Sequence, residues 1–226
     1  MTAPLCLLTR PRAQSLTFAA LLPEIDCLIA PILRIVPLPF DAGLLAGASG
    51  FVFTSANAVP FAGPGQGRPA LVVGPQTAEA ARLAGFDVQE GPGDAEGMLP
   101  LLQGRAGWLH LHGRHRARVL PVPGIAVYDQ VAEPLTADAI AALARARPLI
   151  LPLFSPRSAA LLTNAASDAQ APIATVAISA RADAAYQGPA GLRRIADRPE
   201  GASMQRVIMS LAAGGCDWGT NPDTVG

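Results

Sequence analysis

The sequence predicts an α/β fold in which two similar units each contain a parallel sheet. Short apolar runs alternate with helical patterns along the chain, and this alternation is typical of parallel α/β sheets. The chain also repeats itself, since FTSANA at 53–58 resembles FSPRSA at 154–159, and 85–98 resembles 191–204. Four of the expected strands end in a polar turn that leads into a helix, after Phe53, Val73, Phe154 and Ile178.

In the first half of the chain, apolar runs of strand length are separated by stretches with helical periodicity. The run LCLLT at 5–9 is short and apolar, as expected for a buried strand. Pro37 and Pro39 keep the extended stretch around them out of the centre of a sheet, because proline cannot donate to a ladder. In chain order we expect strand 5–9, helix 12–22, strand 27–29, extended 33–38, helix 42–46, strand 50–53, helix 55–61, strand 70–73, helix 77–84, a strand around Val88 and helix 97–102.

The second half continues the alternation and carries clearer helix-start signals. Thr136 is a good N-cap for a helix that reaches Arg147, where the macrodipole favours arginines. Ser155 caps the next helix, and Pro156 occupies its first position, where a missing amide costs nothing. In chain order we expect strand 108–111, helix 115–120, extended 125–131, helix 136–147, strand 149–154, a helix from 155, strand 173–178, helix 180–186, strand 192–195, helix 202–212 and a loose polar tail over 214–226.

The charge composition excludes several kinds of enzyme. The 226 residues contain 17 basic side chains, all of them arginine, and 17 acidic ones. Without lysine there is no Schiff-base chemistry and no phosphate loop ending in Gly-Lys-Ser/Thr. Zero net charge argues against a nucleic-acid partner, which needs a basic excess. Arginine still binds planar anions with two parallel hydrogen bonds, although Arg145, Arg147 and Arg193 read as ordinary surface charges.

Localisation signals point to a cytoplasmic protein without membrane contact. No apolar run approaches the roughly 18 to 20 residues that span a bilayer. The N-terminus enters a strand-like segment without a basic region, so we expect no export signal. Three scattered cysteines, Cys6, Cys27 and Cys216, are an odd number and fit a reducing compartment.

The polar turns after the strands are the candidate binding sites. In open parallel sheets ligands bind at the carboxyl ends of the strands, where helix N-termini present amides to anions. Two such units facing each other would form an anion-binding cleft. Helix capping alone also explains serine and threonine at these positions. Both interpretations therefore stay open for the two similar turns, Thr54-Ser55-Ala56-Asn57 and Ser155-Pro156-Arg157-Ser158.

Other motifs are weaker. All three histidines lie in 110–115, but no cysteine or acidic residue nearby completes a zinc site, so we expect no metal. The glycines of 63–67 do not follow a strand directly, and the chain has no Gly-x-Ser-x-Gly elbow. Tyr128, in the extended stretch 125–129, is either a proton donor or a packing aromatic.

The order of these segments resembles the uroporphyrinogen-III synthase family over nearly the whole chain, up to about Leu211. No single segment is specific, and the order and spacing carry the resemblance. The matching pieces are 8–11 (LTRP), 53–59 (FTSANAV), 73–78 (VGPQTA) with Gly85, 111–113 (LHG) with 114–120, 127–128 (VY), 154–159 (FSPRSA) and 177–179 (AIS).

The resemblance implies two flavodoxin-like domains, the second inserted in the first, joined by a two-strand linker. The first domain would comprise 1–34 and 132–226, and the second 40–123. The linker strands would be 35–39 and 124–131. The resemblance also implies a cofactor-free cytoplasmic monomer of haem biosynthesis.

The implied reaction closes hydroxymethylbilane, a linear tetrapyrrole, to uroporphyrinogen III with inversion of ring D and loss of water. Tyr128 matches the family's linker tyrosine and becomes the candidate catalytic residue. The later copy of the repeated segment departs from the pattern, because 179–183 (SARAD) has no counterpart of Thr77. The substrate-binding candidates are Arg10, Thr54, Ser55, Asn57, Gly74, Thr77, Gly113, Ser155, Arg157, Ser158 and Ser179.

The alternative function is a non-catalytic, two-lobed binding protein or sensor for a small anion. Such a protein would have the same polar turns but no need for Tyr128. The resemblance does not account for the histidine-rich stretch.

Overall fold

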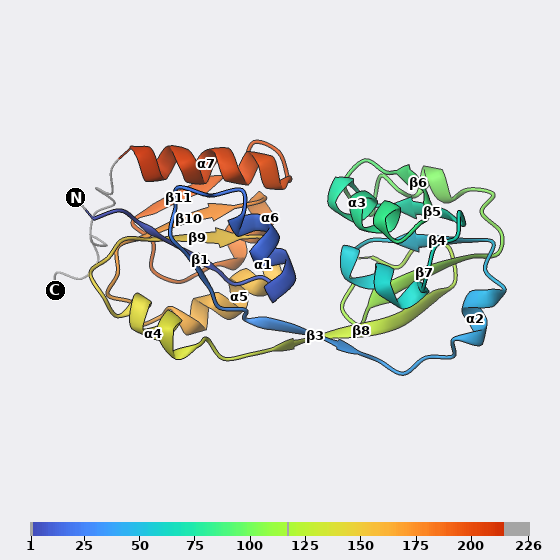
Figure 1. Ribbon diagram of the computed structural model, residues 1–226, viewed down its shortest axis with the longest axis horizontal. Coiled ribbons are helices and arrows are strands. Elements are labelled where there is room, and N and C mark those ends of the chain that lie inside the picture. The colour runs from blue at the N-terminus through green and yellow to red at the C-terminus, as the bar shows by residue number, and fades with distance from the viewer. Residues whose placement is uncertain (1, 117, 215–226) are drawn as a thin grey trace. The chain divides into compact units, whose positions relative to one another are not determined.

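The computed structural model describes residues 2–116 and 118–214. The chain forms two compact units, drawn in Figure 1. The first unit contains the residues up to Arg34 and those from Ala132 onward, and the second contains Ile35–Val131. The chain therefore passes from one unit to the other twice.

The sheet of the first unit has five strands in the order β11-β10-β9-β1-β2. All neighbouring strands run parallel. The expected strands are present with ends shifted by one or two residues at most. Their bounds are β1 Leu5–Leu8, β2 Cys27–Ile29, β9 Leu149–Leu153, β10 Ile173–Ala177 and β11 Leu192–Ile195.

Helices cover both faces of this sheet because side chains alternate between the faces along each strand. Leu7 and Leu151 pack on one face with α4, α5 and α6. Cys6 and Ile150 pack on the other face with α1 and α7, and Figure 1 shows α4 and α7 on opposite sides of the sheet. The helices are α1 Arg12–Ala19, α4 Ala137–Leu143, α5 Pro156–Ala165, α6 Ala180–Ala185 and α7 Gly201–Ala213.

The sheet of the second unit has six strands in the order β3-β8-β7-β4-β5-β6. The five strands from β8 to β6 are parallel. Leu38 N donates to Val127 O and Glu133 N donates to Ile32 O, so β3 and β8 run antiparallel. The strand bounds are β3 Leu33–Pro37, β4 Gly50–Phe53, β5 Pro69–Val72, β6 Asp87–Glu90, β7 Trp108–Gly113 and β8 Gly124–Ala132.

The core of the second unit is centred on three phenylalanines. Phe86 packs edge-on against Phe51 and Phe53, with ring centroids 5.7 and 5.4 Å away. This face of the sheet is covered by η1 and α3, and the other face packs against Met98 and Leu102. The helices of this unit are α2 Gly43–Ala46, the 3₁₀ helices η1 Ala56–Ala62 and η2 Pro100–Leu102, and α3 Pro75–Leu83.

The pair formed by β3 and β8 continues into this sheet. β8 pairs with β7 through His112↔Ala126 and Gly113↔Tyr128. Residues 35–39 and 124–131 belong to the compact unit Ile35–Val131. Their role as linker strands between two domains stays a prediction.

Several expected helices differ from the structure. The helix expected over 12–22 ends at Ala19, and the one expected over 55–61 is the 3₁₀ helix η1. The described residues of 115–120 form no helix, and Arg118 there pairs with Glu96. Segment 97–102 contains only the short η2. The helix capped by Thr136 ends at Leu143, before Arg145 and Arg147.

Among the described residues, no helix combines the length and apolarity needed to cross a membrane. The tail expected over 214–226 lies outside the described residues except for Gly214.

The repeated segments follow strands in corresponding positions. β4 lies between β7 and β5, and β9 lies between β1 and β10. The similar segments at 53–58 and 154–159 therefore both begin at the carboxyl end of a central strand that feeds a helix.

Candidate functional site

The structure divides the predicted site residues into two groups, one in each unit. In the second unit, polar residues follow β4, β5 and β7, which are adjacent in the sheet. Parallel strands end at the same edge, so these residues share the carboxyl edge of the second sheet. They are Thr54, Ser55 and Asn57 after β4, Gly74 and Thr77 after β5, and Gly113 at the end of β7.

The two helices that begin at this edge differ in their caps. The Ser55 hydroxyl accepts a hydrogen bond from Asn57 N at 3.2 Å. Helix α3 starts after Gly74 and has no side-chain cap. Thr77 lies buried in the first turn of α3. The first turn of α3 therefore presents its positive helix end without a competing side-chain oxygen.

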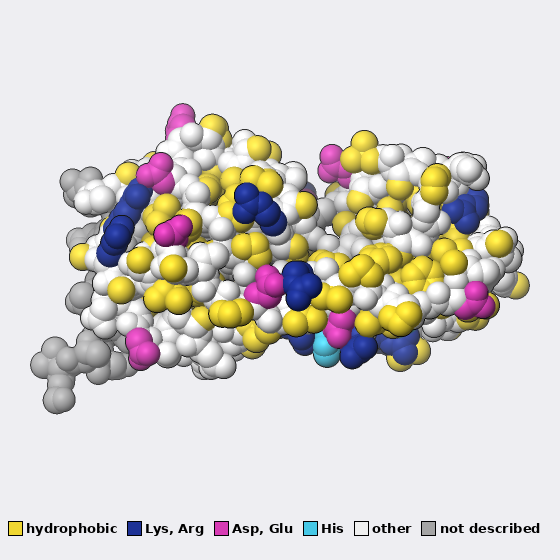
Figure 2. All heavy atoms as spheres, turned by 60° about the horizontal axis from the view of Figure 1, so that its bottom comes forward, with side chains coloured by type: hydrophobic (Ala, Val, Ile, Leu, Met, Phe, Trp, Pro, Cys, Tyr) yellow, Lys and Arg dark blue, Asp and Glu magenta, His cyan; other side chains and the backbone are white. Residues whose placement is uncertain are grey.

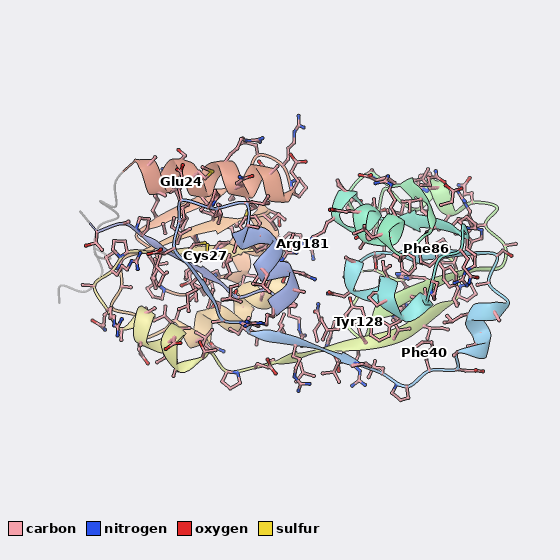
Figure 3. The ribbon with its side chains drawn as sticks, in the orientation of Figure 1. Glu24, Cys27, Phe40, Phe86, Tyr128 and Arg181 are labelled. Atoms are coloured by element: carbon pink, nitrogen blue, oxygen red, sulfur yellow. The ribbon has the colours of Figure 1, made fainter. Side chains whose placement is uncertain are left out.

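Tyr128 lies on β8 of the second unit (Figure 3), directly opposite Gly113. Its ring is buried and stacks on Phe61 with centroids 6.1 Å apart. Burial raises the pKa of Tyr128, and hydrogen bonds from Ser55 and Asn57 oppose that rise. The phenol is therefore held in its protonated form among polar residues of the carboxyl edge.

The histidines of β7 are part of the same unit. His110 Nε2 lies 3.0 Å from the Thr54 hydroxyl, and burial lowers the pKa of His110 to about 3. Arg116 donates to His112 Nε2 at 3.1 Å, so the proton of neutral His112 is on Nδ1, which donates to Gly113 O at 2.7 Å. Within the described part of the chain, no group of three or more His, Cys, Asp or Glu side chains is arranged so that it could hold a metal ion. The histidines hold Thr54 and Gly113 in place.

In the first unit, the predicted residues Arg10, Ser155, Arg157, Ser158 and Ser179 follow β1, β9 and β10. These strands are also neighbours, so the residues share the carboxyl edge of the first sheet.

Arg10 is anchored at this edge by an aromatic ring and a side-chain amide. Its guanidinium carbon lies 4.2 Å from the centroid of the Phe154 ring, and its Nε donates to Gln14 Oε1 at 3.1 Å. Burial lowers the pKa of Arg10 to about 10. The side chain therefore stays charged at neutral pH in a partly desolvated position, where its attraction for an anion is less screened.

The serines of the first unit act as helix caps. Ser155 accepts from Ser158 N at 3.1 Å, and the two hydroxyls lie 2.8 Å apart. Ser179 accepts from Ala182 N at 3.3 Å. The Ser179 hydroxyl, which accepts from an amide, still has a proton to donate to a ligand. The Ser155 and Ser158 hydroxyls bond each other, and Ser158 Oγ also donates to Ser155 O, so a ligand would compete with these bonds.

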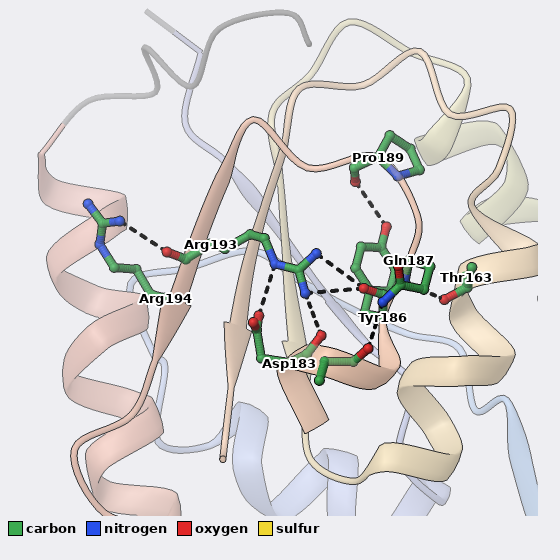
Figure 4. Close-up of polar contacts among 8 residues, drawn as sticks. Thr163, Asp183, Tyr186, Gln187, Pro189, Arg193 and Arg194 are labelled. Carbon is green, nitrogen blue, oxygen red and sulfur yellow. Dashed lines mark hydrogen bonds and ion pairs between the residues drawn. The ribbon is translucent and has the colours of Figure 1, made fainter. Parts of the chain in front are cut away.

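Arg193 is not an ordinary surface charge. Figure 4 shows its guanidinium bound to the Asp183 carboxylate, Nε to Oδ1 at 3.0 Å, and to the carbonyl oxygens of Asp183 and Tyr186. These carbonyls end α6, so Arg193 caps the C-terminus of the helix that Ser179 starts. Arg147 is likewise tied to Asp26 and to Ala3 O.

Sequence reasoning also missed Phe61, Phe154 and His110 as parts of these edges. Phe61 and Phe154 lie in the turn segments 53–61 and 154–159, so an aromatic beside a polar turn was the available signal. His110 had no signal, because its hydrogen bond to Thr54 depends on β7 and β4 being neighbours.

Charges of both signs are interspersed on the face shown in Figure 2, with apolar and uncharged surface between them.

The family model of uroporphyrinogen-III synthase HemD matches residues 24–205. The chain belongs to this family. The match covers the carboxyl-edge turns of both sheets except Arg10.

Solved structures agree with this assignment at the level of the fold. The chain is similar to uroporphyrinogen-III synthetase from Helicobacter pylori 26695, with 16% identity and a TM-score of 0.61 over 92% of this chain and 99% of that one. It is also similar to a mutant uroporphyrinogen III synthase from the extremely thermophilic bacterium Thermus thermophilus, with 19% identity and a TM-score of 0.52 over 93% and 99%. No curated protein matches the sequence significantly. This HemD-family chain therefore shares an α/β fold with parallel sheets with those enzymes.

Proposed function

We propose that the chain carries out its family's reaction at the carboxyl edges of its two sheets. The reaction is the closure of hydroxymethylbilane to uroporphyrinogen III, with inversion of ring D and loss of water. Family membership supplies the reaction and makes the chain an enzyme of tetrapyrrole biosynthesis. The positions of the polar turns at the carboxyl ends of the strands support this location for the reaction.

The chemistry asks the protein mainly to position its substrate. Loss of the hydroxyl group from ring A leaves an azafulvene cation. Ring D attacks this cation through its already substituted carbon, and the resulting spiro intermediate fragments and recloses with ring D inverted. Simple closure gives the type I isomer instead, so the enzyme must hold ring D in the orientation that leads to the spiro route.

The eight carboxylates of the substrate are the groups that the protein would bind. In the first unit, Ser155, Ser158 and Ser179 offer hydroxyls, and Arg10 and Arg157 offer guanidinium groups. In the second unit the hydroxyl and amide side chains are those of Thr54, Ser55, Asn57 and Thr77, beside backbone at Gly74 and Gly113. Helix N-termini add a partial positive charge at both edges, which explains how a chain of zero net charge binds a polyanion.

Tyr128 is the proposed proton donor for the departing hydroxyl group of ring A. A phenol carries its proton at neutral pH, and burial keeps the pKa of Tyr128 above its ordinary value, so the proton is on the oxygen when the water leaves. Ser55 and Asn57 orient the hydroxyl. Gly113 leaves room for the ring, because any larger residue at that position would meet it.

We further propose that each unit is a flavodoxin-like domain and that the enzyme works as a cytoplasmic monomer. The sheet order of the first unit, numbered along that unit, is 2-1-3-4-5, as in flavodoxin. The second unit gives the same order if the numbering begins at β7, which supports a permuted version of the same domain.

The observation that carries the proposal is the placement of Tyr128 among Ser55, Asn57 and Gly113 at a strand-end edge. The test is turnover with the protein at a small fraction of the hydroxymethylbilane concentration. An enzyme converts the excess substrate to the type III isomer over many cycles. A binding protein yields at most one equivalent of that isomer and leaves the rest to spontaneous type I closure, and that result would reject the proposal.

A further inference from the structure

Two of the three cysteines lie side by side on neighbouring strands. Cys6 on β1 and Cys27 on β2 are paired residues of the parallel ladder. Paired residues of adjacent strands point to the same face, and both pack in the core formed with α1 and α7. Neighbouring strands are about 4.8 Å apart, within the Cα separation of about 4.4–6.8 Å at which disulfides form.

The two thiols already contact each other. The side chains of Cys6 and Cys27 are hydrogen-bonded, and both thiols are free. The pair is asymmetric, because Cys6 is fully buried whereas Cys27 is half-buried on the edge strand β2 (Figure 3). A small reagent from solvent can therefore reach the Cys27 thiol before it reaches the buried Cys6 thiol.

The electrostatics follow the same asymmetry. The hydrogen bond to Cys27, followed by burial, raises the pKa of the Cys6 thiol. The same hydrogen bond lowers the pKa of Cys27, against the opposing effects of its own burial and of Asp26. The accessible sulfur is thus the one with more thiolate character, which is the reactive form.

We propose that Cys6 and Cys27 form a redox-sensitive thiol pair that a peroxide converts to a cross-strand disulfide. The Cys27 thiolate attacks one peroxide oxygen, the O–O bond breaks, and Cys27 becomes a sulfenic acid. The Cys6 sulfur then loses its proton and attacks the Cys27 sulfur, which breaks the S–O bond and releases water. The two thiols lose two electrons and two protons, and the peroxide is reduced to two water molecules.

The test uses the full chain with Cys216→Ser, which leaves only Cys6 and Cys27. Hydrogen peroxide is added to the folded protein, and intact mass and titratable thiols are measured after denaturation. The proposal predicts a monomer that has lost the mass of two hydrogen atoms and both thiols, and that regains both with dithiothreitol. The Cys27→Ser, Cys216→Ser double variant is the matched control, and its single buried thiol should stay reduced in the folded state.

Three outcomes would overturn the proposal. One is a gain of oxygen atoms without the loss of two hydrogens. Another is the formation of disulfide-linked dimers alone. The third is two intact thiols after exposure to peroxide that oxidises free cysteine in solution. Oxidation of Cys6 in the Cys27→Ser control at the parent rate would also reject the assigned order of attack.

Discussion

Gly113 and Tyr128 face each other across β7 and β8, and the tyrosine ring occupies the space that a side chain at Gly113 would need. A Cβ atom at Gly113 would lie 2.7 Å from Tyr128 Cζ and 3.0 Å from its hydroxyl oxygen. Cβ atoms essentially never come as close as 2.7 Å to another heavy atom, and Gly113 has no positive φ, so the ring and not the backbone conformation disfavours a side chain at this position. The position of the proposed proton donor is therefore linked to the absence of a side chain on the next strand.

The Gly113→Ala variant tests this linkage. We expect the added methyl group to displace the Tyr128 ring, lowering stability by about 1–3 kcal/mol and reducing kcat more than it raises KM. Gly47→Ala is the matched control, because a Cβ there meets nothing within 4 Å. The measurements are steady-state kinetics and urea denaturation of both variants. Equal kcat values for Gly113→Ala and Gly47→Ala would show that the position of Tyr128 does not limit turnover.

Removing the Tyr128 hydroxyl tests its catalytic role directly. Tyr128→Phe keeps the ring that stacks on Phe61 but loses the hydrogen bonds of the hydroxyl with Ser55 and Asn57. Stability should therefore fall by about 1 kcal/mol with the fold intact, while kcat falls roughly 100-fold. Tyr186→Phe is the control, because its hydroxyl donates to Pro189 O at 3.0 Å within the first unit. That variant should lose about 1 kcal/mol of stability with kcat intact. If Tyr128→Phe turns over like the parent protein, the phenol does not donate the proton.

Helix caps with and without a proposed ligand can be compared in the same unit. Ser155 and Thr136 both accept from an amide in the first turn of their helices. Substituting either with alanine should cost about 1 kcal/mol of unfolding free energy. Only Ser155→Ala should also raise KM, because only Ser155 lies at the strand-end edge that we propose binds the substrate carboxylates. A parallel effect of both variants on KM would leave Ser155 as a cap alone.

His110 makes stability depend on pH. Its pKa is about 3 in the folded state against an ordinary 6.5, so below pH 6.5 the unfolded chain binds a proton that the folded chain does not. Stability is then full above pH 6.5 and falls as the pH drops toward 3, by about 2 kcal/mol between pH 7 and pH 5.

The matched variant for this effect is His110→Gln, which keeps an amide near the Thr54 hydroxyl without a titrating group. Urea denaturation at pH 7 and pH 5 should show a smaller loss for the variant than for the parent. His112 contributes in the same direction in both proteins, because burial also lowers its pKa. An identical loss in the two proteins would mean that His110 is protonated in the folded state.

Local signals in the sequence predicted most of the fold. Strands 27–29, 50–53 and 192–195 lie where expected, and Thr136 and Ser155 cap their helices as their side chains suggest. The expected helix at 115–120 was wrong, and the contact of Arg118 with Glu96 there is tertiary, of a kind that local propensity does not predict.

The polar turns were predictable, but their partners were not. Two such interactions are the bond by which Arg193 caps α6 and the hydrogen bond between Thr54 and His110. Both depend on which strands are adjacent, and short apolar runs in the sequence do not specify that order. The same holds for Cys6 and Cys27, which are far apart in sequence and paired only by the register of β1 and β2.

The central claim is that the chain directs ring closure through the inverted ring D. The most direct measurement supplies hydroxymethylbilane, oxidises the products and separates the porphyrin isomers by chromatography. The account predicts that the type III isomer predominates and that its share rises with enzyme concentration, at the expense of spontaneous type I. A type III fraction that stays at the level without enzyme would contradict it.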